Sequence, residues 1–158
     1  MASVFDQKRI SVEGTISETS TVFNVKFEQD QPAFIDLGGV TIINSVGVKN
    51  WINWISRANG KTVIHFFNCP FVIVNQASTV HGFMPKFAFI ESFRAPYVCP
   101  KCTKETIVTL TRPTDFDYAT EDKPKKISLP TSYVCEKCKL EMEPDFTEEK
   151  HLAFLKLK

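Results

Sequence analysis

The stretch FIDLGGVTIINSVGVKNWINWI, residues 34–55, predicts a buried strand followed directly by an amphipathic helix. The apolar run AFIDL at 33–37 ends at Gly38-Gly39, which favours a short buried strand closed by a turn. Residues 45–58 then carry apolar side chains at the i, i+3, i+4, i+7 spacing of one helical face. These residues are Val48, Trp51, Ile52 and Ile55. A strand followed by a helix is typical of an α/β domain.

The ends of this helix also carry local signals. Asn44 or Ser45 is the natural N-cap, and Asn59-Gly60 is expected to close the helix in a left-handed conformation. Trp51 and Trp54 are three residues apart, so we expect one of them in the core. Trp54 is then a candidate for an exposed partner surface.

The segments around this unit continue the α/β pattern. Residues 9–16 predict a strand with a kink or bulge at Gly14, whereas residues 18–28 fit a short helix and a strand equally well. Residues 62–67 and 87–93 predict two further strands. The order of strands and helices favours an α/β sheet with at least some parallel pairing.

A second helix is expected between these last two strands. It would begin at Pro70, with Asn68 as a capping residue, because proline is tolerated in the first helical turn. Its predicted inner stripe consists of Ile73, Ala77, Val80 and Met84.

The first 95 residues resemble the STAS family, the anti-sigma factor antagonist fold, over about residues 5–95. That family has an apolar strand, a D-L-x-x-V/L turn, a second apolar stretch and a serine-containing motif that opens a helix. The matching residues are Asp36-Leu37, Val40, Ile42-Ile43 and Ser45-Val46-Gly47. The resemblance implies a STAS-like mixed sheet with helices and a protein partner, such as an anti-sigma kinase.

The resemblance also implies that Ser45 is a phosphorylation site. A phosphate at the start of a helix would meet free N–H groups and the positive end of the helix dipole. Two positions differ from the family pattern, since Asn44 replaces an acidic residue and Val46 replaces a small polar one. The alternative is that Ser45 only caps the helix.

Two matched cysteine pairs, VCPKC at 98–102 and VCEKC at 134–138, predict a metal site after the first domain. Two such knuckles complete a tetrahedral site of four sulfur ligands, which has no open position and so has a structural role. We therefore expect one structural zinc ion. Its ligands would be Cys99, Cys102, Cys135 and Cys138. Two redox pairs or a disulfide framework are the alternatives.

The spacing of the two pairs favours a zinc ribbon built on a β-hairpin. Strand 105–111 is expected to pair with a return strand at about 127–134, with a polar, proline-rich loop over 113–130 between them. The tail at 147–158 predicts a short helix capped by Thr147. The chain would thus divide into a STAS-like domain at 1–95 and a zinc-ribbon module with its tail helix at 96–158.

Charge and motifs narrow the class of function. The net charge is +1, and residues 96–158 contain 11 basic and 11 acidic residues, so nucleic-acid binding is not expected. We find neither a signal peptide nor a membrane span, which indicates a cytoplasmic protein. No catalytic motif is recognisable, so we do not expect an enzyme. We also expect Cys69 to be a buried inert thiol and His65 a satisfied core or rim residue.

These observations favour a non-enzymatic bacterial regulatory protein that binds a protein partner through the surface around Ser45. The alternative hypothesis is a nucleic-acid-associated accessory protein that uses the zinc ribbon. The sequence is also compatible with a homodimer.

Overall fold

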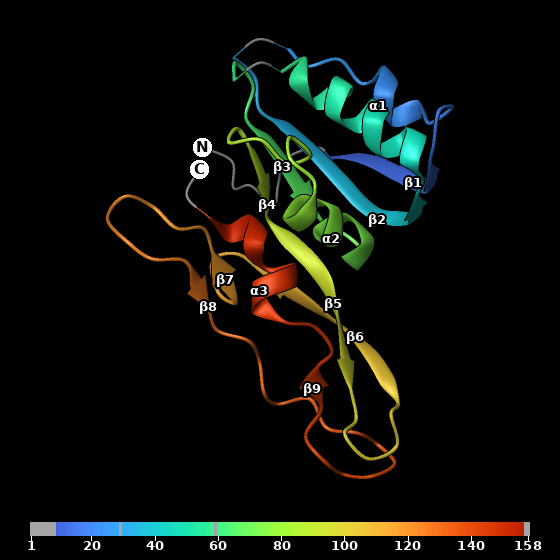
Figure 1. The fold of residues 1–158 in the computed structure, drawn as a ribbon, viewed down its shortest axis with the longest axis vertical. Helices are drawn as coiled ribbons and strands as arrows, with labels where there is room; N and C mark the ends of the chain where they lie inside the picture. Colours follow the sequence, from blue (N-terminus) through green and yellow to red (C-terminus); the bar gives the residue numbers. More distant parts are fainter. Residues whose placement is uncertain (1–8, 29, 59, 157–158) are drawn as a thin grey trace.

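The computed structural model describes residues 9–28, 30–58 and 60–156 and has a parallel four-stranded sheet at its centre (Figure 1). The strands lie in the order β1-β2-β3-β4, and all three neighbouring pairs are parallel. Their bounds are Ile10–Ile16, Ala33–Ile43, Ile64–Phe67 and Ala88–Ile90. The predicted α/β class with parallel pairing is confirmed.

Two helices connect the last three strands: α1, Ser45–Ser56, and α2, Phe71–Thr79. Both tryptophans of α1 are fully buried, so the exposed partner surface predicted for Trp54 is wrong. Trp51 Nε1 donates to the Phe83 carbonyl at 2.8 Å, and Trp54 Nε1 donates to the Val25 carbonyl at 3.0 Å. Trp54 is covered because the ambiguous segment 18–28 forms the short 3-10 helix η2, Thr21–Asn24, followed by extended chain. Two phenylalanine rings of that segment contact the Trp54 indole: Phe23 and Phe27.

Strand β2 is longer than predicted, because it runs through Gly38-Gly39 without a turn. The two glycines lie where the partner strand β1 is irregular, with register shifts between Ser11 and Glu13 and between Gly14 and Thr15. A Cβ atom on Gly39 would lie 2.7 Å from Glu13 Cγ. Gly39 therefore allows close approach of β1, whereas a Cβ atom on Gly38 would lie 3.1 Å from Arg94 Nη2. Neither glycine ends the strand. The predicted irregularity at Gly14 is confirmed.

The start and end of α2 also differ from the prediction. Pro70 is the N-cap residue, and Asn68 does not cap the helix. Asn68 has a φ of 53°, and its Nδ2 donates to Asp36 Oδ2 at 2.9 Å, so its side chain joins β2. The helix ends at Thr79, before the last two residues of the predicted stripe.

The predicted strand 87–93 is divided between two sheets. After β4, the chain continues as β5, Ser92–Val98, at the centre of a second sheet of order β6-β5-β9. Strands β6, Glu105–Thr111, and β9, Glu143–Pro144, flank it. The domain boundary expected between residues 95 and 96 falls inside β5. Strands β5 and β6 extend away from the parallel sheet as a long hairpin (Figure 1).

The predicted pairing of 105–111 with 127–134 is wrong, although the strand at 105–111 itself is confirmed. Strand β6 pairs with β5, because the first cysteine knuckle is the turn that joins them. Of the expected return strand, only Ile127 lies in a named strand, the short β8, Lys126–Ile127, which pairs with β7, Phe116–Asp117. Both strands lie within the predicted loop 113–130, so that prediction is wrong for these residues.

The C-terminal tail contains the predicted helix start at Thr147, whose Oγ1 accepts from the Lys150 N–H. Helix α3, Glu148–His151, is short and is followed by the 3-10 helix η3, Ala153–Leu155. Three apolar side chains of the tail are buried: Leu152, Phe154 and Leu155. Ser78 Oγ of α2 donates to the His151 carbonyl at 2.7 Å, so the tail packs on the first domain. In the described part of the chain, no helix has both the length and the apolar character needed to cross a bilayer.

We predict that Gly47→Ala lowers the free energy of unfolding by 2 kcal/mol or more, on the order expected for overpacking a rigid contact. A Cβ atom at this position would lie 2.2 Å from the Ile16 carbonyl oxygen, because the first turn of α1 rests on the end of β1. Urea unfolding of both proteins measures the difference. Ser45→Ala, in the same turn but exposed, is the control and should change stability little; equal stability of Gly47→Ala and wild type would contradict the close contact.

Candidate metal centre

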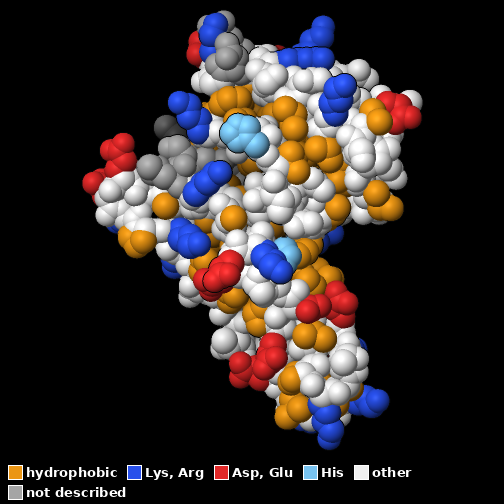
Figure 2. All heavy atoms as spheres, in the orientation of Figure 1, with side chains coloured by type: hydrophobic (Ala, Val, Ile, Leu, Met, Phe, Trp, Pro, Cys, Tyr) orange, Lys and Arg blue, Asp and Glu red, His pale blue; other side chains and the backbone are white. Residues whose placement is uncertain are grey.

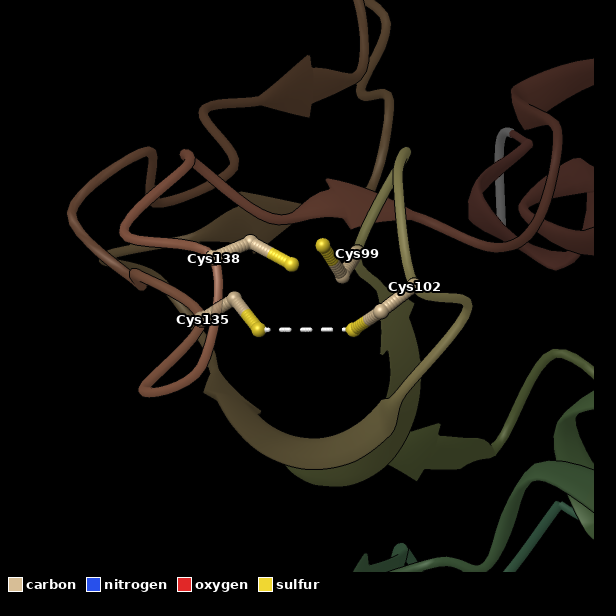
Figure 3. A group of neighbouring side chains, drawn as sticks. All are labelled: Cys99, Cys102, Cys135 and Cys138. Carbon is tan, nitrogen blue, oxygen red and sulfur yellow. Dashed lines mark hydrogen bonds between the residues drawn. The ribbon is translucent and has the colours of Figure 1, made fainter.

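Four cysteine side chains converge at the far end of the β5–β6 hairpin (Figure 3). Their sulfur atoms all lie within 4.8 Å of one another, and Cys102 Sγ lies 3.6 Å from Cys135 Sγ. Cys99 and Cys102 belong to the turn between β5 and β6, and Cys135 and Cys138 belong to the loop before β9. The structure thus brings together all four cysteines that the sequence predicted as ligands.

The two cysteine turns have the same backbone geometry. In the first, the Cys99 carbonyl accepts from the Thr103 N–H at 3.1 Å, and the Cys99 N–H donates to the Lys104 carbonyl at 2.9 Å. Thr103 has a φ of 62°, a left-handed conformation that closes the turn. The second turn repeats both hydrogen bonds, at 2.8 and 2.9 Å, with a φ of 59° at its fifth residue. The equivalent residues are Cys135, Lys139 and Leu140.

The sulfur spacing fits a tetrahedral metal ion. Zinc–sulfur bonds of about 2.3 Å place the sulfurs of a regular tetrahedron about 3.8 Å apart. The distance of 3.6 Å between Cys102 and Cys135 is close to this value and much longer than a disulfide bond of about 2.05 Å. All four are free thiols. The group is therefore positioned to bind one metal ion.

The turns also favour the thiolate form of two ligands. The Cys102 N–H lowers the pKa of the Cys99 thiol to about 6, against the opposing effect of burial. The Cys138 N–H lowers the pKa of Cys135 in the same way. Burial and the neighbouring sulfurs raise the pKa of Cys138 to about 12, so this thiol depends on a cation to ionise. A bound metal ion would supply that charge.

The lysines beside the turns are exposed, as expected for residues that offset the negative charge of four thiolates. Lys104 Nζ lies 3.7 Å from Glu136 Oε2 and so links the two turns. Both side chains are largely in water, where such a pair contributes little stability. The other three lysines are Lys101, Lys137 and Lys139.

Ser45 lies at a separate place, at the start of α1. Asn44 caps the helix, since its Oδ1 accepts from the Gly47 N–H at 2.7 Å. The alternative in which Ser45 acts as the cap is therefore wrong. The Ser45 side chain is exposed, and so are the apolar side chains of two residues near it in the chain, Ile42 and Val46.

Two other predicted residues have the expected environments. Cys69 is fully buried, and burial raises the pKa of its thiol, so it is the inert core residue that the sequence indicated. His65 is half-buried, and its Nδ1 lies 2.8 Å from Glu91 Oε1. In the described residues, the four cysteines form the one group of possible metal ligands, and it contains no histidine.

Sequence reasoning missed the ionic network around Glu91. Its Oε1 contacts His65 Nδ1 and Arg112 Nη1, and Arg112 Nε donates to Asp117 Oδ1 at 2.7 Å. The residues are far apart in the chain and share no motif. The one available signal was the pair of charged or polar residues, His65 and Glu91, within otherwise apolar strands.

Comparisons with family models, with curated proteins and with solved structures give no match to this chain. The resemblance to the STAS family therefore stays a prediction from the sequence.

We predict that the purified protein holds one divalent metal ion per chain and that Cys102→Ser loses it. A serine at this position removes one of four sulfur ligands. Elemental analysis after gel filtration in a reducing, chelator-free buffer measures the ratio. Cys69→Ser is the matched control and should keep the metal, because Cys69 lies in the core away from the cluster. Metal-free wild type, or the same metal content in wild type and Cys102→Ser, would contradict the site.

Proposed function

We propose that this chain is a non-enzymatic, cytoplasmic regulatory protein. In this proposal its first domain is STAS-like and binds a protein partner, for example an anti-sigma kinase, through the surface around Ser45. The four cysteines hold a structural zinc ion. One observation supports the docking surface. The Ser45 side chain is exposed and does not serve as the helix cap, and the nearby apolar residues Ile42 and Val46 are exposed as well.

The local geometry around Ser45 supports a rigid docking surface. The side chain of Ile42 is 57% exposed and that of Val46 is 47% exposed, so two apolar side chains near Ser45 in the chain are open to a partner. The backbone beneath them is fixed, because the Asn44 N–H donates to the Ile16 carbonyl at 3.1 Å and Gly47 packs on the same oxygen. A partner would therefore meet a preformed surface and lose little entropy on ordering it.

Phosphorylation of Ser45 would change this surface without unfolding it. A phosphate adds a charge of about −1.5 to −2 and three strong acceptor oxygens. At the first position of α1 this charge lies at the positive end of the helix dipole. Since Asn44 already satisfies the Gly47 N–H, the added group would extend outward between Ile42 and Val46. An apolar partner surface would then face a dianion.

The metal module supports a structural role for zinc. Four thiolates complete a tetrahedral zinc shell and leave no position for water or substrate. Its surface is mixed in charge, and Figure 2 shows acidic and basic side chains interspersed with hydrophobic ones along the hairpin. This distribution disfavours a phosphate-binding surface, so protein binding is preferred over nucleic-acid binding.

We predict that Val46→Lys abolishes binding of the partner, because a charged ammonium replaces an apolar contact in the proposed interface. Val63→Lys is the matched control, since Val63 is 42% exposed and lies just before β3, at the opposite end of the sheet. Affinity purification with quantitative mass spectrometry compares the three proteins. A partner retained by wild type and Val63→Lys but lost by Val46→Lys supports the surface, and equal recovery by all three contradicts it.

We also predict that Ser45→Asp weakens the same complex while Ser45→Ala leaves it unchanged. The fold should not be affected, because an acidic residue in the first turn stabilises a helix by about 0.3–1 kcal/mol. Thermal unfolding checks stability and pull-down against the identified partner checks binding. Equal binding by the aspartate and alanine variants would contradict the switch.

A further inference from the structure

A cavity of about 380 Å³ lies where the parallel sheet meets the hairpin. Its walls include Phe67 and Asn68 from the end of β3, Glu91 and Ser92 from the junction of β4 and β5, and Thr109 from β6. Ligands of open parallel sheets bind beyond the carboxyl ends of the strands, and this cavity occupies such a position. Its volume is within the range of small-molecule sites.

The charges that line the cavity favour an anion. Two arginines, Arg9 and Arg112, face one carboxylate, Glu91. That carboxylate is already satisfied, because its Oε1 contacts His65 Nδ1 at 2.8 Å and Arg112 Nη1 at 3.0 Å. The lining alone thus carries a net charge of +1, from two arginines and one glutamate. Outside the lining, Asp36 pairs with Arg9 and Asp117 pairs with Arg112.

Both arginines keep unused hydrogen-bond donors. A guanidinium has five N–H groups. Among the described residues, Arg9 forms one ion pair, a loose contact of 3.8 Å from Nη1 to Asp36 Oδ2, and its Cζ atom lies 3.6 Å from the centre of the Phe67 ring. Arg112 uses Nε and Nη1 for Asp117 and Glu91, which fixes the orientation of its remaining Nη2 group.

Neutral donors and an apolar wall complete the lining. The side chains of Asn68, Thr109 and Thr111 supply an amide and two hydroxyl groups, and the exposed Pro113 supplies an apolar surface. Charge-assisted hydrogen bonds from guanidinium groups are well suited to carboxylates and phosphates. Among the described residues of the lining, Glu91 is the one carboxylate, and it is already paired with His65 and Arg112.

We propose that this cavity binds a small-molecule oxyanion, a carboxylate or a phosphate, between Arg9 and Arg112. This site is separate from the docking surface around Ser45 and from the four cysteines, so it does not depend on the function proposed for either.

The test uses the full chain with its metal retained, titrated with sodium benzoate and with inorganic phosphate at constant ionic strength. Two-dimensional ¹H–¹⁵N NMR should show saturable shifts of the Asn68, Ser92 and Thr111 amides with one probe or both, which also assigns the carboxylate or phosphate class. Benzamide, which is uncharged and has the same ring, should give none of these shifts.

Arg9→Gln should weaken binding about tenfold or more, the loss expected for one charge-assisted contact. Arg57→Gln is the matched control, because Arg57 lies at the end of α1 and contacts the Phe23 carbonyl. A second variant, Thr109→Val, removes one hydroxyl group from the cavity lining and should weaken binding. It should not affect the fold, because the Thr109 side chain is exposed. Absence of saturable shifts with both probes, equal shifts with benzamide, or equal affinity of Arg9→Gln and Arg57→Gln would overturn the proposal.

Discussion

The fold depends on one continuous run of extended chain, residues 88–98, that belongs to two sheets. As β4 it pairs in parallel with β3, and as β5 it pairs antiparallel with β6. The change occurs at Glu91, whose N–H donates to the Phe66 carbonyl at 2.8 Å while its carbonyl accepts from the Arg112 N–H at 2.9 Å. Glu91 therefore bonds to both sheets through its backbone and to Arg112 through its side chain. These bonds fix the direction in which the hairpin leaves the parallel sheet.

The far end of the hairpin has less secondary structure to hold it, so a metal ion bound by the four cysteines would stabilise it. Strand β9 has two residues, and the second cysteine turn is held by the isolated bridge between Val134 and Glu141. Several of its apolar side chains are exposed: Ile107, Tyr133, Val134 and Leu140. Closing a loop of 32 residues between the cysteine pairs costs entropy, on the order of 3–4 kcal/mol for a cross-link of this length. A four-sulfur metal site would offset that cost where burial does not.

The features that the sequence predicted correctly are local. The α1 helix follows from apolar spacing, and the cysteine cluster follows from two identical turns whose backbone bonds repeat one another. The errors arose where a distant segment decides the outcome. Gly38-Gly39 looked like a turn because the bulged neighbour β1 was not visible in the local sequence. Asn68 looked like a helix cap because its bond to Asp36 crosses 32 residues. Strand β6 pairs with β5, which precedes the first cysteine pair, and not with residues 127–134, which precede the second pair.

Strand β2 separates the two proposed binding sites on the first domain. Asp36, beside the cavity, and Ile43, next to the Ser45 surface, are seven residues apart on one strand, a distance of about 23 Å. Because β2 is paired with β1 along most of its length, it acts as a rigid spacer. The start of α1 and the cavity between Arg9 and Arg112 are therefore separate surfaces. Two backbone pairings connect them: β1–β2, with register shifts between Ser11 and Glu13 and between Gly14 and Thr15, and β2–β3, which pairs Asp36 with Phe67 at the cavity.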